Sequence, residues 1–126
     1  MSAALNTIII YARNMQKTAC FYRDFFGFET SGLVVEGLIE LRSSNGGANL
    51  LIHQAAKSLK LGYAGLKLSF DVPDVDAFKV HAAERGLKFG ATHQANGYSF
   101  ANTKDPDKNS ISISSRAYRT AGATAK

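Results

Sequence analysis

The sequence carries the same order of predicted elements twice, at an offset of about 60 residues. Each half contains a strand-like run, a helix-like run and then three further strand-like runs, a β-α-β-β-β order. Matching positions in the two halves are Leu5 and Leu66, Gly27 and Gly86, and Leu50-Leu51-Ile52 and Ile111-Ser112-Ile113. The repeat predicts an internal duplication, and the mixture of elements predicts an α+β fold class.

In the first half, a helix begins after Asn14, which predicts an N-cap, and ends at Gly27. Asn45-Gly46-Gly47 favours a hairpin, because these residues tolerate positive φ. The predicted strands of this half are 5–11, 28–35, 38–43 and 48–54.

In the second half, Asp74 predicts the cap of a helix that ends at Gly86, and Asp105-Pro106-Asp107 predicts a turn. The predicted strands are 66–72, 87–94, 98–103 and 110–115. The polar segment 55–63 is typical of a linker. We therefore expect one domain over residues 1–126, with modules at about 5–54 and 65–115 and a loose basic tail at 116–126.

Alternation along the strands predicts which side chains share a face. Ile111 and Ile113 oppose Ser110, Ser112 and Ser114 in the last strand. In the strands 48–54 and 66–72, Leu51 and His53 oppose Leu50 and Ile52, and Lys67 opposes Leu68. The polar faces either meet solvent or line a concavity that binds a ligand.

Composition restricts the function classes. An apolar fraction of 45 % suits a globular core, and a single cysteine, Cys20, excludes an intrachain disulfide and a multi-thiol metal site. Neither a membrane span nor a secretory signal is expected, so we predict a cytoplasmic protein. Lysines and arginines give a net charge of +5 but are scattered, which argues against a nucleic-acid partner and leaves an anionic small ligand open.

Four stretches of the chain resemble the vicinal oxygen chelate superfamily, which includes glyoxalase I, bleomycin-resistance proteins and extradiol dioxygenases. They are NTIIIYARNMQKTACFYRDFFGF, IELRSSNGGANLLIHQ, KLSFDVPDVDAF and YSFANTKDPDKNSISIS. The resemblance implies two tandem β-α-β-β-β modules whose mixed sheets curl into a cup, usually within a homodimer.

Metal-using members of that superfamily place His, Gln or Glu at one position in each of four strands. The matching positions here are Asn6, Leu51, Lys67 and Ser112. Leu51 has no donor atom, Lys67 brings a positive charge, and the other two are weak neutral donors. We therefore expect no metal and no cofactor.

Several polar residues are candidates for ligand contact, each with a structural alternative. Lys67 can pair with an anionic ligand or with Asp71, and His53 is an acid/base candidate or a surface histidine. Asn6 and Ser112 can hydrogen-bond a ligand, or satisfy each other or water. Tyr98, beside Gly97, can close over a ligand or serve packing. The predicted ligand-binding residues are Asn6, Leu51, His53, Lys67, Tyr98 and Ser112, and no catalytic residue is assigned.

Two functions follow from these residues. The first is a metal-independent, cup-shaped protein that binds a neutral or anionic small molecule. The alternative is a glyoxalase-like lyase, isomerase or dioxygenase that uses a metal through other residues or acid-base chemistry by Lys67, His53 and Tyr98.

Overall fold

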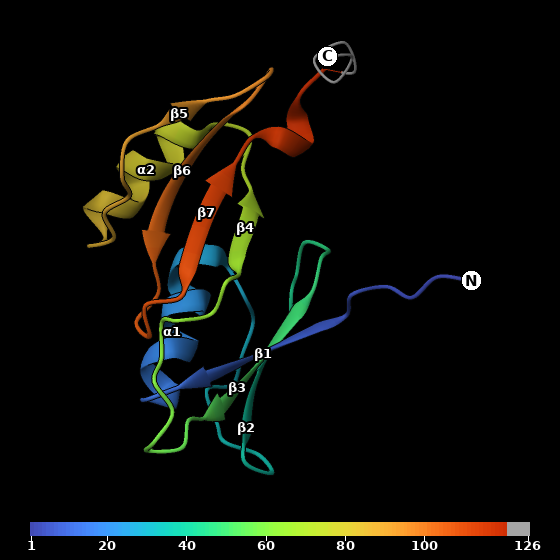
Figure 1. Ribbon diagram of the computed structural model, residues 1–126, viewed down its shortest axis with the longest axis vertical. Helices are drawn as coiled ribbons and strands as arrows, with labels where there is room; N and C mark the ends of the chain where they lie inside the picture. The colour runs from blue at the N-terminus through green and yellow to red at the C-terminus, as the bar shows by residue number, and fades with distance from the viewer. Residues whose placement is uncertain (121–126) are drawn as a thin grey trace. The chain divides into compact units, whose positions relative to one another are not determined.

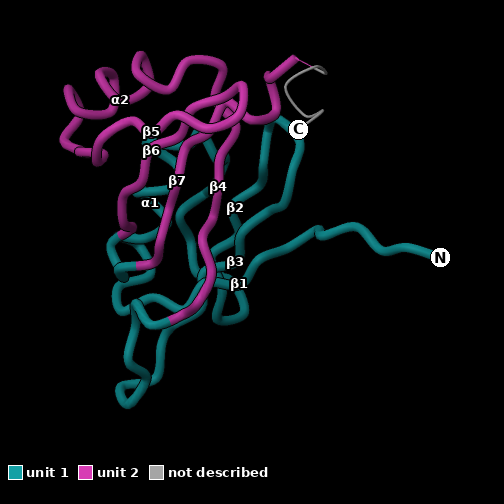
Figure 2. The backbone as a smooth tube through the Cα atoms, turned by 45° about the horizontal axis from the view of Figure 1, so that its top comes forward, with its two compact units in different colours: residues 1–63, 106–108 teal, residues 64–105, 109–126 magenta. Residues whose placement is uncertain are grey.

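The computed structural model describes residues 1–120 and divides them into two compact units. The first unit contains Met1–Tyr63 and Pro106–Lys108, and the second contains Ala64–Asp105 and the described residues from Asn109 onward (Figure 2). Residues 121–126 of the predicted basic tail lie outside the described residues.

The first unit holds one helix and a three-stranded mixed sheet (Figure 1). Its elements are β1 (Thr7–Ala12), α1 (Met15–Phe26), β2 (Leu38–Leu41) and β3 (Asn49–Gln54). The strand order is β1-β3-β2, with β1 parallel and β2 antiparallel to β3. The predicted hairpin between β2 and β3 is confirmed, and Gly46 and Gly47 adopt φ of 78° and 83°.

The caps predicted for α1 are confirmed. The Asn14 side chain accepts a hydrogen bond from the Lys17 backbone N–H at 3.0 Å, which satisfies one of the free donors of the first turn. Gly27 ends the helix in the left-handed conformation, at φ 75°. The helix α1 contacts all three strands of the sheet. The fully buried core here includes Tyr22, Ile39, Leu41, Leu50 and Ile52.

The strand predicted at 28–35 is wrong, because the structure has only two isolated bridges in this region, Glu29 with Arg42 and Val35 with Leu38. The hydroxyls of Thr30 and Ser31 accept hydrogen bonds from the backbone N–H groups two residues on. Such local turns compete with a strand ladder. Gly32 then takes φ 74°, outside the strand region, so pairing stops between the two bridges.

The second unit holds one helix and a four-stranded mixed sheet. Its elements are β4 (Lys67–Asp71), α2 (Val75–Glu84), β5 (His93–Gln94), β6 (Ser99–Lys104), β7 (Ser110–Ser114) and the short 3₁₀ helix η1 (Arg116–Tyr118). The order is β4-β7-β6-β5, with β4 parallel to β7 and the other pairs antiparallel.

Local signals in the second unit also act as predicted. The Asp74 carboxylate caps α2 by accepting from Ala77 N at 3.0 Å. Asp105 accepts from the backbone N–H and the side-chain amide of Asn109, at 2.9 and 2.8 Å, which closes the turn before β7. Ile111, Ile113 and Ala101 are fully buried, so the apolar face predicted for the last strand is confirmed.

The long strand predicted at 87–94 is wrong, since only His93 and Gln94 pair in β5. Phe89 is buried, and its ring contacts Phe78 of α2, with centroids 6.1 Å apart. Thr92 donates to the Asp76 carboxylate at 2.6 Å, which ties its side chain to the same helix. These contacts with α2 take the place of a continuous ladder.

The two units repeat one topology. In each, the first strand lies parallel to the last strand in sequence, and the last strand lies antiparallel to the one before it. The predicted α+β class with two tandem modules is confirmed in this sense, although 28–35 does not supply the fourth strand of the first sheet. The single-domain boundaries stay a prediction.

Candidate functional site

One face of the second sheet gathers the polar side chains predicted from alternation. The strand registers arrange them in rows that cross the sheet. The rows are Lys67–Ser110–Lys104, then Ser69–Ser112–Asn102, then Asp71–Ser114–Phe100 with His93 beside it. This polar face is our candidate site, and it is opposite the buried Ile111 and Ile113.

Hydrogen bonds cross the polar face, two of them between neighbouring strands and one from β4 over β7 to β6. Lys67 Nζ donates to Asn102 Oδ1 at 3.1 Å, and Ser112 Oγ donates to Ser69 Oγ at 2.9 Å. Lys104 Nζ donates to Ser110 Oγ at 3.1 Å. Ser112 is only 4 % exposed, so its hydroxyl needs a partner and finds it on β4. Lys67 therefore pairs with Asn102 rather than with Asp71, the alternative considered from sequence.

The other end of the polar face is aromatic. The Phe100 ring lies 5.2 Å from the His93 ring and 6.4 Å from the Tyr98 ring, measured between centroids. The Arg116 guanidinium lies over the Tyr98 ring, 5.7 Å from its centroid, in a cation-π arrangement. Tyr98 lies just before β6 and is spaced by two and four residues from Phe100 and Asn102, so alternation puts its side chain on the polar face.

Charge on this face is mainly positive. Lys67 and Lys104 are both exposed, and within residues 1–120 neither makes an ion pair with a carboxylate. Asp71 is also on the face but belongs to the row farthest from the lysine row. The lysine end of the face is therefore suited to an anionic group.

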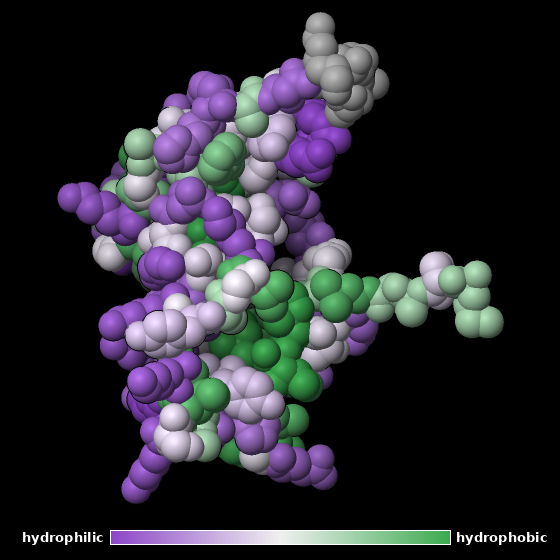
Figure 3. Space-filling view, in the orientation of Figure 1, coloured by the Kyte–Doolittle hydropathy of each residue, from purple (hydrophilic) through white to green (hydrophobic). Residues whose placement is uncertain are grey.

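The matching face of the first sheet is apolar. Ile9 and Tyr11 of β1 are 53 % and 46 % exposed, and Ile9 is paired with the half-buried Leu51. Figure 3 shows hydrophobic side chains gathered over the strands of this unit. The polar exceptions on these strands include His53 and Glu40, which are both exposed.

His53 has a defined ring orientation. Its Nδ1 lies 3.0 Å from the Gln54 carbonyl oxygen, which accepts a hydrogen bond when Nδ1 carries a proton. Nε2 of the neutral ring is then an acceptor. The Tyr11 ring lies 5.2 Å away, tilted by 52°.

Asn6 lies just before β1, and its Oδ1 accepts from Thr7 Oγ1 at 2.7 Å. Counting back by alternation groups Asn6 with the buried Ile10, whereas Leu51 is paired with Ile9 on the open face. The structure thus brings Lys67, Ser112 and Tyr98 together on one face. Leu51 and His53 share another face, and Asn6 stands apart from both.

Metal-ligand chemistry does not fit the four positions. No group of three or more His, Cys, Asp or Glu that could hold a metal ion occurs in the described part of the chain. The available donors at these positions are the Asn6 amide and the Ser112 hydroxyl, because the Lys67 ammonium group has no lone pair and Leu51 has no donor atom. A divalent ion prefers carboxylate, imidazole or thiolate ligands, so the donor set is unsuitable for it.

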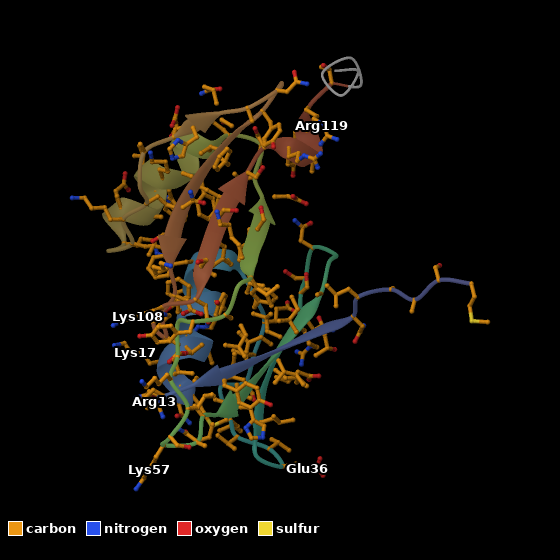
Figure 4. The ribbon with its side chains drawn as sticks, viewed as in Figure 1. Arg13, Lys17, Glu36, Lys57, Lys108 and Arg119 are labelled. Carbon is orange, nitrogen blue, oxygen red and sulfur yellow. The ribbon has the colours of Figure 1, made fainter. Side chains whose placement is uncertain are left out.

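Other charged groups spread over the exterior of the first unit. Lys17, Lys57 and Lys108 end outward, and the Arg13 guanidinium donates to the carbonyls of Ala56 and Leu59 (Figure 4). Within residues 1–120, no helix has the length and apolar character needed to cross a membrane.

Comparison with known proteins decides the family. The model of the Glyoxalase/Bleomycin resistance protein/Dioxygenase superfamily matches residues 4–113. The chain belongs to this superfamily. The resemblance drawn from the sequence motifs is therefore confirmed, and no curated protein matches the sequence.

Several solved structures share the fold of this chain. The antibiotic binding protein TnmS3 from Streptomyces sp. CB03234 is 20 % identical, with a TM-score of 0.72 and coverage of 90 % of this chain and 94 % of the other. Lactoylglutathione lyase from Agrobacterium tumefaciens is 22 % identical, with a TM-score of 0.69 and the same coverage. The oxidase ChaP-H2 is 20 % identical, with a TM-score of 0.69 and coverage of 92 % and 95 %. At these identities the likeness shows the fold alone.

Sequence reasoning did not single out Asn102, Ser69, Lys104, Phe100 and Tyr11 as site residues. Alternation within β4 and β6 does mark the faces of these residues. The pairing of β6 with β7 was the missing information, because it is the register that puts Asn102 beside Ser112 and Lys104 beside Ser110.

Proposed function

We propose that this protein binds a neutral or anionic small molecule without a catalytic metal, using the polar face of its second unit. Lys67, Ser112 and Tyr98 are the proposed contacts there. Asn6, Leu51 and His53 of the first unit stay proposed ligand contacts on sequence grounds. A homodimer and a cytoplasmic location complete the proposal, as expectations from the family resemblance and from composition.

The observation that carries this proposal is the ammonium group of Lys67. It occupies a position where metal-using relatives carry a ligand, and a cation there repels a divalent ion. The Lys67–Asn102 and Ser112–Ser69 hydrogen bonds make a polar surface around two of the four positions, Lys67 and Ser112. The antibiotic binding protein of the same fold is consistent with a binding role. A net charge of +5 disfavours a strongly cationic guest.

The direct test is thermal unfolding of the protein with a panel of metabolites and antibiotics that includes neutral and anionic members. A ligand at 100 times its Kd stabilises the folded state by about 2.7 kcal/mol, which raises Tm measurably. We expect at least one neutral or anionic compound to raise Tm without added metal. A panel in which no compound raises Tm would count against the proposal.

A glyoxalase-like enzyme that works by metal-free acid-base chemistry is the second candidate, and His53 is the observation that favours it. In the tautomer that donates from Nδ1 to the Gln54 carbonyl, Nε2 is a proton acceptor on a ring beside Tyr11. A base at that atom would abstract a proton from a carbon acid, as lyases and isomerases require.

Two variants separate the candidates, with Lys88→Ala as the control because its exposed side chain is off the polar face. If the protein is a binder, Lys67→Ala weakens ligand binding, and no substrate turnover exists for His53→Ala to remove. If it is an enzyme, the parent turns over a substrate and His53→Ala abolishes that turnover while binding persists.

A further inference from the structure

The lysine row of the polar face is a paired cationic site. Lys67 on β4 and Lys104 on β6 are both register partners of Ser110, so they flank one residue from either side. Because β7 separates β4 from β6, an anion placed over Ser110 would lie between two positive charges, one from each side. Neither lysine makes an ion pair with a carboxylate anywhere in residues 1–120.

Hydrogen-bond donors outnumber acceptors around this pair. Each ammonium group has three N–H donors and uses one of them, on Asn102 or on Ser110. The Asn102 side-chain oxygen accepts from Lys67, and its NH₂ group adds two further donors to the face. Ser69 accepts from Ser112 and so keeps its own hydroxyl proton to donate. The oxygens of a carboxylate, sulfonate or phosphate supply the missing acceptors.

An aromatic surface begins two rows from the lysine row and one row from Asn102. Phe100 is two residues from Asn102 along β6, a separation of about 7 Å in a strand. Lys67 Nζ reaches the Asn102 row, so an anion held there lies within the length of a two-ring ligand from Phe100. His93 and Tyr98 extend the aromatic surface on either side of Phe100.

We infer that the ligand is a planar aromatic molecule with one anionic group, which the Lys67–Lys104 pair binds while its rings stack on Phe100. This inference rests on the proposed function and deepens it by naming the ligand class. The carboxylate of Asp71, in the Phe100 row, disfavours a second anionic group at the aromatic end.

The test uses two fluorescent dyes that share one ring system. Anilinonaphthalene sulfonate carries a sulfonate, and N-phenylnaphthylamine lacks it. Both are titrated at low ionic strength against the parent protein, Lys67→Gln, Lys104→Gln and the control Lys88→Gln. We expect the sulfonate dye to bind about tenfold tighter than the neutral dye. Each site variant then loses most of that preference, and Lys88→Gln keeps it.

The outcomes distinguish failure of the inference from failure of the proposed function. Equal affinity for the two dyes, or a preference that survives in the Lys67→Gln/Lys104→Gln double variant, overturns the inference and leaves small-molecule binding intact. Failure of both dyes to bind contradicts the inference and the proposed function together. If a variant does not fold, inorganic sulfate added to the parent protein decides. Sulfate displaces the sulfonate dye and not the neutral dye if the inference holds.

Discussion

The two units of this protein have the same strand topology but open faces of opposite character. Leu51 of β3 and Ser112 of β7 occupy matching positions in the repeat, each in the last strand of its unit and beside a parallel partner. Leu51 pairs with Ile9 on an apolar face, whereas Ser112 donates to Ser69 on a polar face rich in donors. On the helix side, the matching Ile52 and Ile113 are both fully buried.

This difference distinguishes the buried residues that stabilise the fold from the open-face residues that can contact a ligand. The buried isoleucines must stay apolar, because each fills a packed core that tolerates little change of volume. The open-face positions differ in chemistry within one chain, with an aliphatic side chain at Leu51 and a hydroxyl group at Ser112. The polar face is therefore the better place to look for function.

Ile52 and Ile113 occupy matching core positions of the two units, and truncation of each residue tests most strongly whether they are equivalent. We expect Ile52→Ala and Ile113→Ala each to lower the free energy of unfolding by about 2–5 kcal/mol, because both remove methyl groups from fully buried sites. Urea denaturation measures the change, with Leu51→Ala as the half-buried control of smaller effect. A loss below about 1 kcal/mol in one variant only would break the equivalence.

The turns before β3 and β7 differ, and this difference is testable at Asp107. Asp107 is 5 % exposed, accepts from Arg13 N at 2.9 Å and from Thr18 Oγ1 at 2.6 Å, and belongs to the first unit. Asp107→Ala leaves the buried Thr18 hydroxyl without this acceptor, and we expect a loss of about 2–3 kcal/mol. The exposed Asp71→Ala is the control, with an effect within about 0.5 kcal/mol. Equal unfolding curves for the two variants would contradict a structural role for Asp107.

Exchange of the open-face residues sharpens the comparison further. Ser112→Leu introduces a large side chain at a position that is 4 % exposed and removes the bond to Ser69, so we expect a loss of about 1–3 kcal/mol. Leu51→Ser at the matching position is the partner experiment, measured by the same urea titration. If Ser112→Leu leaves stability unchanged, the polar face is less tightly packed than the structure indicates.

We expect the smallest change in stability from a substitution at Gly62, in the connection between the two repeats. Gly62 has φ +86°, and a Cβ there would lie 2.9 Å from Lys108 Cβ. We expect Gly62→Ala to cost about 1–2 kcal/mol through the left-handed backbone. The control Gly65→Ala has open space and no positive φ, so its Tm should equal or slightly exceed that of the parent. A Gly62→Ala protein as stable as the control would show that this segment is free to move.

Local signals explain how much of the fold could be predicted. Asn14, Gly27 and Asp74 act through the backbone atoms of their own helices, so the sequence around them is sufficient. The strand predicted at 28–35 does not form, and the strand predicted at 87–94 is reduced to His93 and Gln94. The causes are the Thr30 and Ser31 hydroxyl turns in one case and the tertiary contacts of Phe89 and Thr92 with α2 in the other.

The candidate site, too, could be predicted only as far as local patterns reach. Alternation alone placed Lys67 and Ser112 on one kind of face, and the structure confirms that they share it. The partners Asn102 and Ser69 depend on the pairing of strands distant in sequence, which no local pattern specifies.

The central claim is binding of an organic ligand without a metal, and native mass spectrometry of the protein purified gently from its own cells, without added metal or chelator, tests it most directly. The account predicts a protein mass that carries an organic adduct and no metal ion. One divalent ion bound per chain would contradict it, because the ion would require ligands that Asn6, Leu51, Lys67 and Ser112 do not supply.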